Sequence, residues 1–312
     1  MEKNTDNDLK PRTHMSASAA LYTGVLSLVP AGAKFKAGAE TTRRRIENIR
    51  KRGEKRYEYP HLCPDADISE SEICGIRTYI LQREKRGDRV LVYIHGGGFV
   101  QEMLPMHWFF LDDIAAMTGA AVYIPIYPLA PFCTYRDLYP KIIDYYREIA
   151  RDNPGCKMIL SGDSAGGNIA AVIAENLSPD EQPDELILLS PALSMHVDPI
   201  APDDIESFNK CLLVGVEAAI VLGEYWAGGR ENMNSPLVSP IDGDVSPLRS
   251  VTIYAGERDM AYAMSLRFAE KLSEAGVKTE TVIGKGMPHV WPVMSFPEAH
   301  EARRQIAEII RR

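Results

Sequence analysis

Residues 157–168 read KMILSGDSAGGN, and this stretch decides the fold. An apolar run leads into Gly162-Asp163-Ser164-Ala165-Gly166, and the helix-forming run NIAAVIAEN follows at residues 168–176. Glycine two residues before and after the serine permits a turn so tight that side chains there would collide. We therefore expect a strand, a sharp turn that exposes Ser164, and a helix whose N-terminus favours a developing negative charge.

Apolar runs and amphipathic runs alternate on both sides of this turn. Strands are predicted at residues 76–82, 89–94, 121–126, 157–160, 185–189, 250–254 and 279–283, and helices at 15–28, 39–53, 106–117, 141–151, 168–176, 216–226, 263–275 and 297–311. Runs such as LVYI and LILL are apolar throughout, which is typical of strands buried on both faces. The alternation predicts an α/β protein whose mainly parallel sheet is flanked by helices.

The domain organisation follows from one interruption of this alternation. The chain has 312 residues, a length that one large α/β unit can reach. Residues 195–230 are too long for a single crossover helix, so we interpret them as an insertion over the C-terminal edge of the sheet. Together with residues 1–55 they are predicted to form a helical cap, and the core would comprise residues 56–194 and 231–312.

A second glycine-rich motif, His95-Gly96-Gly97-Gly98-Phe99, follows the strand predicted at 89–94. Consecutive glycines let backbone N–H groups face a reacting carbonyl without obstruction by side chains. Each such donor stabilises a tetrahedral intermediate by ~3 kcal/mol. We expect an oxyanion hole formed by the N–H groups of Gly97, Gly98 and Ala165, the residue after the serine.

The two motifs together resemble those of the hormone-sensitive-lipase-like family of α/β-hydrolase esterases. The segment YPLAP at 127–131 is similar to the family's Y-R-L-A-P segment, and the Ser-Pro pairs at 235–236 and 239–240 are similar to its S-P element. The resemblance implies an eight-stranded, mainly parallel sheet and a cap built from the N-terminal region and an insertion after the sixth strand. Pro128, Phe132 and Phe99 depart from the family's usual residues, which leaves the shape of the pocket open.

The other catalytic residues should follow Ser164 in the sequence, because the order in this fold is Ser, then Asp or Glu, then His. His289 lies in GKGMPHVW just beyond a predicted strand, and it resembles the family's terminal histidine element. Asp259 stands thirty residues earlier in a G-x-x-D arrangement that matches the family's acid. Glu257 is the alternative acid.

These residues predict a carboxylic-ester hydrolase in which Ser164 attacks the ester, His289 transfers the proton and Asp259 orients the imidazole. Neither a metal nor an organic cofactor is needed for this chemistry. The resemblance implies a small-molecule ester with a short- to medium-chain acyl group as substrate. Two alternatives stay open, namely a non-catalytic small-molecule-binding protein and an amidase or peptidase with the same triad. His196 and His300 are expected to have structural or surface roles.

The composition indicates which partners and which cellular compartment to expect. The formal net charge of −8 argues against a nucleic-acid partner. The five cysteines are odd in number and widely spaced, so we expect no disulfide framework, no zinc site and a cytoplasmic protein, with a Cys63–Cys74 bridge as the alternative. Residues 15–33 lack charge but contain Ser, Thr, Gly and Pro, which favours a cap helix over a signal peptide or a membrane span and leaves a membrane-associated segment as an alternative. The family resemblance adds a homodimer as an option.

Overall fold

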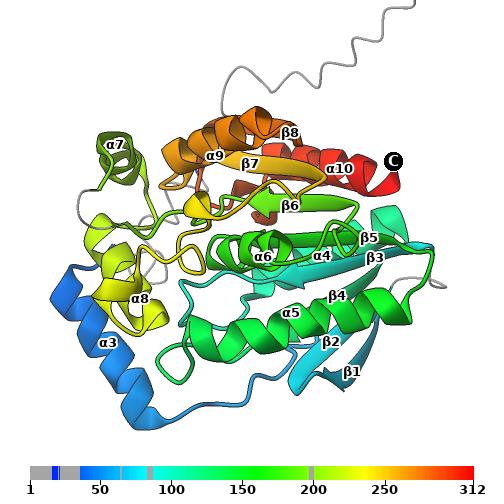
Figure 1. The fold of residues 1–312 in the computed structure, drawn as a ribbon, viewed down its shortest axis with the longest axis horizontal. Helices are drawn as coiled ribbons and strands as arrows, with labels where there is room; N and C mark the ends of the chain where they lie inside the picture. Colours follow the sequence, from blue (N-terminus) through cyan, green and yellow to red (C-terminus); the bar gives the residue numbers. More distant parts are fainter. Residues whose placement is uncertain (1–15, 20, 22–35, 64, 83–86, 197–199) are drawn as a thin grey trace, which may run out of the picture.

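The computed structural model describes residues 16–19, 21, 36–63, 65–82, 87–196 and 200–312. In this part of the chain, eight strands form one sheet in the order β1-β2-β4-β3-β5-β6-β7-β8 (Figure 1). The strands are β1 (Asp67–Ile73), β2 (Ile76–Gln82), β3 (Arg89–Ile94), β4 (Ala121–Ile126), β5 (Lys157–Asp163), β6 (Glu185–Leu189), β7 (Ser250–Arg258) and β8 (Lys278–Pro288). β2 pairs antiparallel with β1 and β4, and the other neighbours are parallel. The predicted eight-stranded, mainly parallel sheet is confirmed.

The edge strand β1 is one that the sequence pattern did not predict. Its sequence DISESEI is mostly exposed, so it lacks the apolar alternation by which a strand is recognised. Pairing with β2 forms it, from Asp67 opposite Gln82 to Ile73 opposite Ile76. The acidic side chains along this outer edge discourage further strands from pairing with it.

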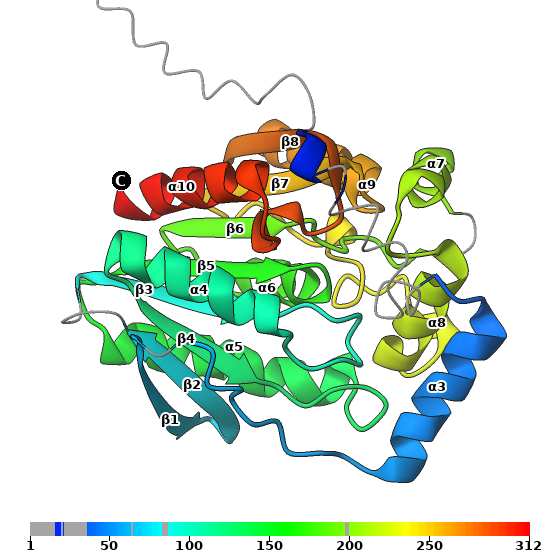
Figure 2. The same ribbon diagram turned by 180° about the vertical axis from the view of Figure 1, so that it is seen from behind.

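Helices cover both faces of the sheet. They are α3 (Ala39–Arg52), α4 (Pro105–Thr118), α5 (Tyr135–Asp152), α6 (Ala165–Glu175), α7 (Pro202–Lys210), α8 (Val216–Ala227), α9 (Tyr262–Glu274) and α10 (Pro297–Arg311), with short 3-10 turns at Arg230–Asn232, Pro240–Asp242 and Trp291–Val293. α5, α6 and α9 lie on one face, and α4 and α10 lie on the other (Figures 1 and 2). The flanking helices predicted from the sequence are therefore present.

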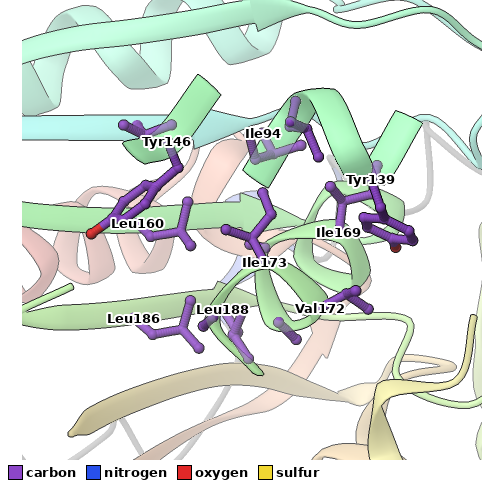
Figure 3. Close-up of a cluster of buried hydrophobic side chains, with 14 of the residues drawn as sticks. Ile94, Tyr139, Tyr146, Leu160, Ile169, Val172, Ile173, Leu186 and Leu188 are labelled. Atoms are coloured by element: carbon purple, nitrogen blue, oxygen red, sulfur yellow. The ribbon is translucent and has the colours of Figure 1, made fainter. Parts of the chain in front are cut away.

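Successive side chains of the central strands point to opposite faces, and both sets are apolar. Leu160, Leu186 and Leu188 pack against α6 residues such as Ile173 (Figure 3). Their neighbours along the strands, including Ile159, belong to the cluster that contacts α4 and α10. Burial on both faces is what the continuous apolar runs predicted.

α5 begins six residues before its predicted start at 141. Pro140 lies inside the helix, and an interior proline normally ends or kinks one, which is why the pattern favoured a later start. The true start is capped by Thr134, whose N–H and hydroxyl both donate to the Asp137 carboxylate, at 2.9 and 2.7 Å. The T-x-x-D sequence at 134–137 is the signal that could have located it.

α8 and α3 pack against each other beyond the end of the sheet that carries Ser164 (Figures 1 and 2). The backbone N–H of Ala39 donates to Glu217 Oε2 at 2.9 Å, and Tyr225 Oη donates to Glu47 Oε1 at 2.6 Å. The segment at 195–230 contains α7 as well as the helix predicted at 216–226. The domain boundaries 1–55, 56–194, 195–230 and 231–312 stay predictions.

Most of the helix predicted at 15–28 lies outside the described residues. Of the described ones, Ser16 donates through its N–H and its hydroxyl to the Glu298 carboxylate at the start of α10, at 2.6 and 2.9 Å. No described helix is both long and apolar enough to cross a membrane. All five cysteines are described and none forms a disulfide, so the alternative of a Cys63–Cys74 bridge is wrong.

Candidate active site

Ser164 lies in the turn between β5 and α6. Its φ of 51° and ψ of −118° are unusual for a residue other than glycine, a strain that costs of order 1–3 kcal/mol. Its N–H donates to the carbonyl oxygen of Leu189 at the end of β6, at 2.9 Å, which helps to hold the turn. A Cβ on Gly166 would collide with the carbonyl oxygens of Ile94 and His95. Glycine is therefore required there because α6 starts so close to the end of β3.

His289 and Asp259 lie beside Ser164, just beyond the ends of β8 and β7. His289 Nε2 is 2.9 Å from Ser164 Oγ, and His289 Nδ1 is 2.6 Å from Asp259 Oδ1. Asp259 is fully buried and His289 nearly so. Because Nδ1 faces a carboxylate, it holds the ring proton, and Nε2 is left to accept the serine proton. The three residues singled out in the sequence are thus brought together.

The carboxyl group of Asp259 is ionised in this environment. Burial raises its pKa, but the charge and hydrogen bond of His289, the Ser190 hydroxyl and the Ala261 N–H outweigh burial and lower the pKa below its ordinary value. Asp259 Oδ1 accepts the Ala261 N–H at 2.8 Å. A buried carboxylate kept ionised beside an imidazole favours the imidazolium form when a proton arrives.

The other candidates named from the sequence lie elsewhere. Glu257 accepts the Gly286 N–H at 2.8 Å and so supports the chain within β8. His196 pairs with Asp242 at 2.5 Å, and His300 is exposed on α10. None of the three lines the cavity beside Ser164.

The triple-glycine loop follows β3 and faces Ser164. Gly97 and Gly98 have φ values of 133° and 61°, which favour glycine, and both line the same cavity as Ser164 and Ala165. The next residue, Phe99, stacks on Trp226 of α8 with ring centroids 4.7 Å apart and planes 5° from parallel. α8 therefore packs directly against the end of the triple-glycine loop.

Asp163, the residue before Ser164, anchors this loop from below. Its carboxylate accepts the Tyr93 hydroxyl at 2.7 Å and the Gly96 N–H at 2.8 Å, and His107 Nε2 lies 3.4 Å away. Burial raises the pKa of Asp163, but His107, Tyr93 and Gly96 together lower it below its ordinary value. No role was predicted for Asp163 from the sequence. Its partners Tyr93 and Gly96 come from β3 and the loop after it, and only the folded chain brings them to Asp163.

A cavity of about 250 Å³ opens beside Ser164. Its lining is mostly apolar and includes Phe208 of α7 and Leu222 of α8. The methionines that line it are Met106, Met195, Met260, Met264 and Met294. None of the described residues that line it is Lys or Arg. Such a lining suits an uncharged ligand with an aliphatic part, and the flexible methionines can adapt to its shape.

The chain belongs to the α/β-hydrolase fold family, which its residues 91–293 match. It is 29% identical over 252 residues to an esterase from Acinetobacter venetianus, an alignment that covers 78% of this chain and 82% of that protein. It is 28% identical over 232 residues to the carboxylesterase/phospholipase LipF of Mycobacterium tuberculosis, which covers 72% of this chain and 62% of that protein.

Solved structures share the fold along almost the whole chain. A Staphylococcus aureus protein superposes with a TM-score of 0.84 at 22% identity, covering 93% of this chain and 99% of that one. An esterase from the bacterial hormone-sensitive lipase family superposes with a TM-score of 0.79 at 22% identity, and the superposition covers 96% of this chain and 98% of that one. With the family match, these findings confirm the resemblance that the HGGGF and GDSAGG motifs indicated.

Proposed function

We propose that this protein is a serine carboxylic-ester hydrolase with Ser164 as nucleophile, His289 as general base and Asp259 as the orienting acid. The observation that carries the proposal is the continuous chain of contacts, 2.9 Å from Ser164 Oγ to His289 Nε2 and 2.6 Å from His289 Nδ1 to Asp259 Oδ1. A serine hydroxyl is a weak nucleophile until an adjacent base accepts its proton. Two relatives, an esterase and a carboxylesterase/phospholipase, support the same class of reaction.

The mechanism has two stages. Ser164 Oγ attacks the ester carbonyl carbon while His289 Nε2 takes the hydroxyl proton, and collapse of the tetrahedral intermediate releases the alcohol with that proton. A water molecule then attacks the acyl group on Ser164 with His289 as base, which releases the carboxylic acid and restores the serine. The ionised Asp259 stabilises the imidazolium in both stages.

The developing oxyanion is stabilised in this proposal by the N–H groups of Gly97, Gly98 and Ala165. All three residues line the cavity that contains Ser164. Ala165 also begins α6, whose N-terminus adds partial positive charge. Each donor of this kind contributes ~3 kcal/mol to stabilisation of the transition state.

The proposed substrate is an uncharged ester with a short- to medium-chain acyl group. A cavity of about 250 Å³ with an apolar lining accommodates a few methylene groups beside the carbonyl, and no Lys or Arg among the described lining residues would pair with an anionic group. Residues 1–55 and 195–230 act as the cap in this proposal, because α7 and α8 supply Phe208 and Leu222 to the cavity. A cytoplasmic location is proposed because the five cysteines form no disulfide.

The test is hydrolysis of a series of nitrophenyl esters from two to twelve carbons by the purified protein and by Ser164→Ala. We expect activity that peaks at short or medium chains and falls by orders of magnitude in the variant. Ser194→Ala is the matched control, because Ser194 lines the same cavity outside the triad. Equal activity in folded Ser164→Ala and wild type would refute the mechanism, and a peak at the longest chain would refute the substrate class.

A further inference from the structure

Ser190 follows β6, between the strands that lead to Ser164 and to Asp259. It is fully buried and has a φ of 48°. Its N–H donates to the carbonyl oxygen of Tyr254 in β7, at 2.6 Å. A residue other than glycine keeps such a conformation only where its surroundings hold it, and such residues cluster at functional sites.

The Ser190 hydroxyl contacts the loop that carries the imidazole. Its Oγ accepts the N–H of Val290, the residue directly after His289, at 2.8 Å. Val290 has a φ of 60°, which is a rare conformation for a β-branched side chain. The hydrogen bond therefore helps to hold a strained backbone next to His289, and the direction of the imidazole depends on that backbone.

The same hydroxyl still has a proton to donate, because accepting one hydrogen bond does not use it. Asp259 Oδ1 already accepts from His289 and from the Ala261 N–H. Asp259 Oδ2 is buried and has no well-aligned donor among the described residues. The Ser190 hydroxyl lies near enough to the Asp259 carboxylate to contribute a hydrogen bond that lowers the pKa of Asp259.

We propose that Ser190 is a positioning residue, which accepts the Val290 N–H and donates to the Asp259 carboxylate, and thereby fixes the position of the loop that carries His289 relative to Asp259. This inference rests on the proposed function. Among the described residues, the titratable groups that face Asp259 are the His289 imidazole and the Cys211 thiol, and the pKa of the thiol is raised by burial and then by the Asp259 carboxylate. The thiol therefore stays protonated at neutral pH, and the pH dependence of the carboxylate is coupled to His289.

The test compares Ser190→Ala, Ser190→Gly and Ser190→Thr with wild type. Glycine accepts a φ of 48° without strain, so it removes the hydroxyl while relaxing the backbone. We expect kcat to fall about 10- to 100-fold in the Ala and Gly variants with KM within about twofold, the range for loss of one hydrogen bond to a charged group. Threonine should restore part of kcat. Ser265→Ala is the control, because Ser265 is buried and its hydroxyl has no partner among the described residues.

A second readout separates positioning from general damage. A carboxylate that has lost a donor holds the imidazolium more strongly, so the acid limb of the kcat/KM profile should move to higher pH in the Ala and Gly variants. The downfield proton resonance of His289 Nδ1 reports the same titration without any substrate, and its midpoint should rise in parallel.

The outcomes distinguish this inference from the proposed function. Failure of the wild-type protein to hydrolyse any ester would refute the proposed function. The His289 Nδ1 proton resonance would still test the role of Ser190, because it is measured without substrate. An unchanged resonance midpoint in Ser190→Ala would overturn the inference. Full activity in Ser190→Gly would also overturn it, because the hydroxyl would then be dispensable.

Discussion

Replacement of Asp163 by asparagine tests how the triple-glycine loop is held. The carboxylate of Asp163 accepts from Tyr93 and Gly96 through Oδ1, and its Oδ2 faces His107 Nε2. His107 Nδ1 accepts the Leu104 N–H at 2.9 Å, so the ring proton lies on Nε2 and points at Oδ2. An asparagine of the same shape keeps one acceptor but presents its NH2 group to the N–H of His107.

The loss of stability expected for Asp163→Asn follows from these contacts. Loss of the charge weakens the two bonds from Tyr93 and Gly96, and the buried His107 N–H loses its acceptor, which alone costs ~1–3 kcal/mol. We expect Asp163→Asn to lower the free energy of unfolding by about 3 kcal/mol at pH 7. We also expect kcat/KM to fall at least about tenfold, because the bond to Gly96 positions the loop that carries the proposed oxyanion donors Gly97 and Gly98.

Urea unfolding and ester hydrolysis measure the two effects. Asp244→Asn is the matched control, because the exposed Asp244 carboxylate bonds to the N–H and hydroxyl of the nearby Ser246, and its loss should leave both quantities close to wild type. The pKa of Asp163 is lowered in the folded state, so its contribution to stability is present above about pH 4 and is lost as the pH falls below it. The difference in free energy of unfolding between Asp163→Asn and wild type should therefore become smaller below about pH 4. Equal urea midpoints at pH 7 would show that Asp163 does not hold the loop.

Two further predictions concern a half-buried acid, Glu102, and the wall of the cavity. Burial and the nearby Glu54 raise the pKa of Glu102 to about 7. Stability should therefore fall as the pH rises from about 5 to 7, and Glu102→Gln should stabilise the protein by roughly 1–2 kcal/mol at pH 8 but not at pH 4. Urea unfolding at both pH values checks this, and equal stability at pH 8 would contradict it. Met264 lines both the main cavity and a smaller neighbouring one, so Met264→Ala should join them and shift the ratio of kcat/KM for octanoyl over acetyl esters upward several-fold. Met158→Ala, in the core away from both cavities, is the control, and an unchanged ratio in Met264→Ala would show that this wall does not limit chain length.

The architecture and the grouping of Ser164, Asp259 and His289 were predictable because the signals for strands and glycine turns are local, and because the sequences around Asp259 and His289 resemble the family's motifs. The serine turn and the triple-glycine loop need glycine for steric reasons, and buried parallel strands are apolar throughout. The elements that escaped prediction lack such an apolar pattern or have it interrupted. β1 is polar and depends on pairing with β2, and the early start of α5 was obscured by Pro140.

The contacts of Asp163 and Ser190 could not be predicted for a different reason. Their partners come from other strands and loops, so they appear only when the chain is folded. A serine at the end of an apolar run, such as Ser190 after LILL, has no distinguishing pattern in the sequence. Its proposed role depends on the neighbouring strand order β5-β6-β7, which places Ser190 between Ser164 and Asp259.

The most direct measurement is the mass of the intact protein, and of its peptides, after treatment with a fluorophosphonate probe. Only a serine activated by a neighbouring base reacts rapidly with such a probe. We predict a single adduct on the peptide that contains Ser164, and labelling slowed by orders of magnitude in His289→Ala. The absence of an adduct on Ser164, or equally fast labelling without the imidazole, would contradict the proposed catalytic role of this site.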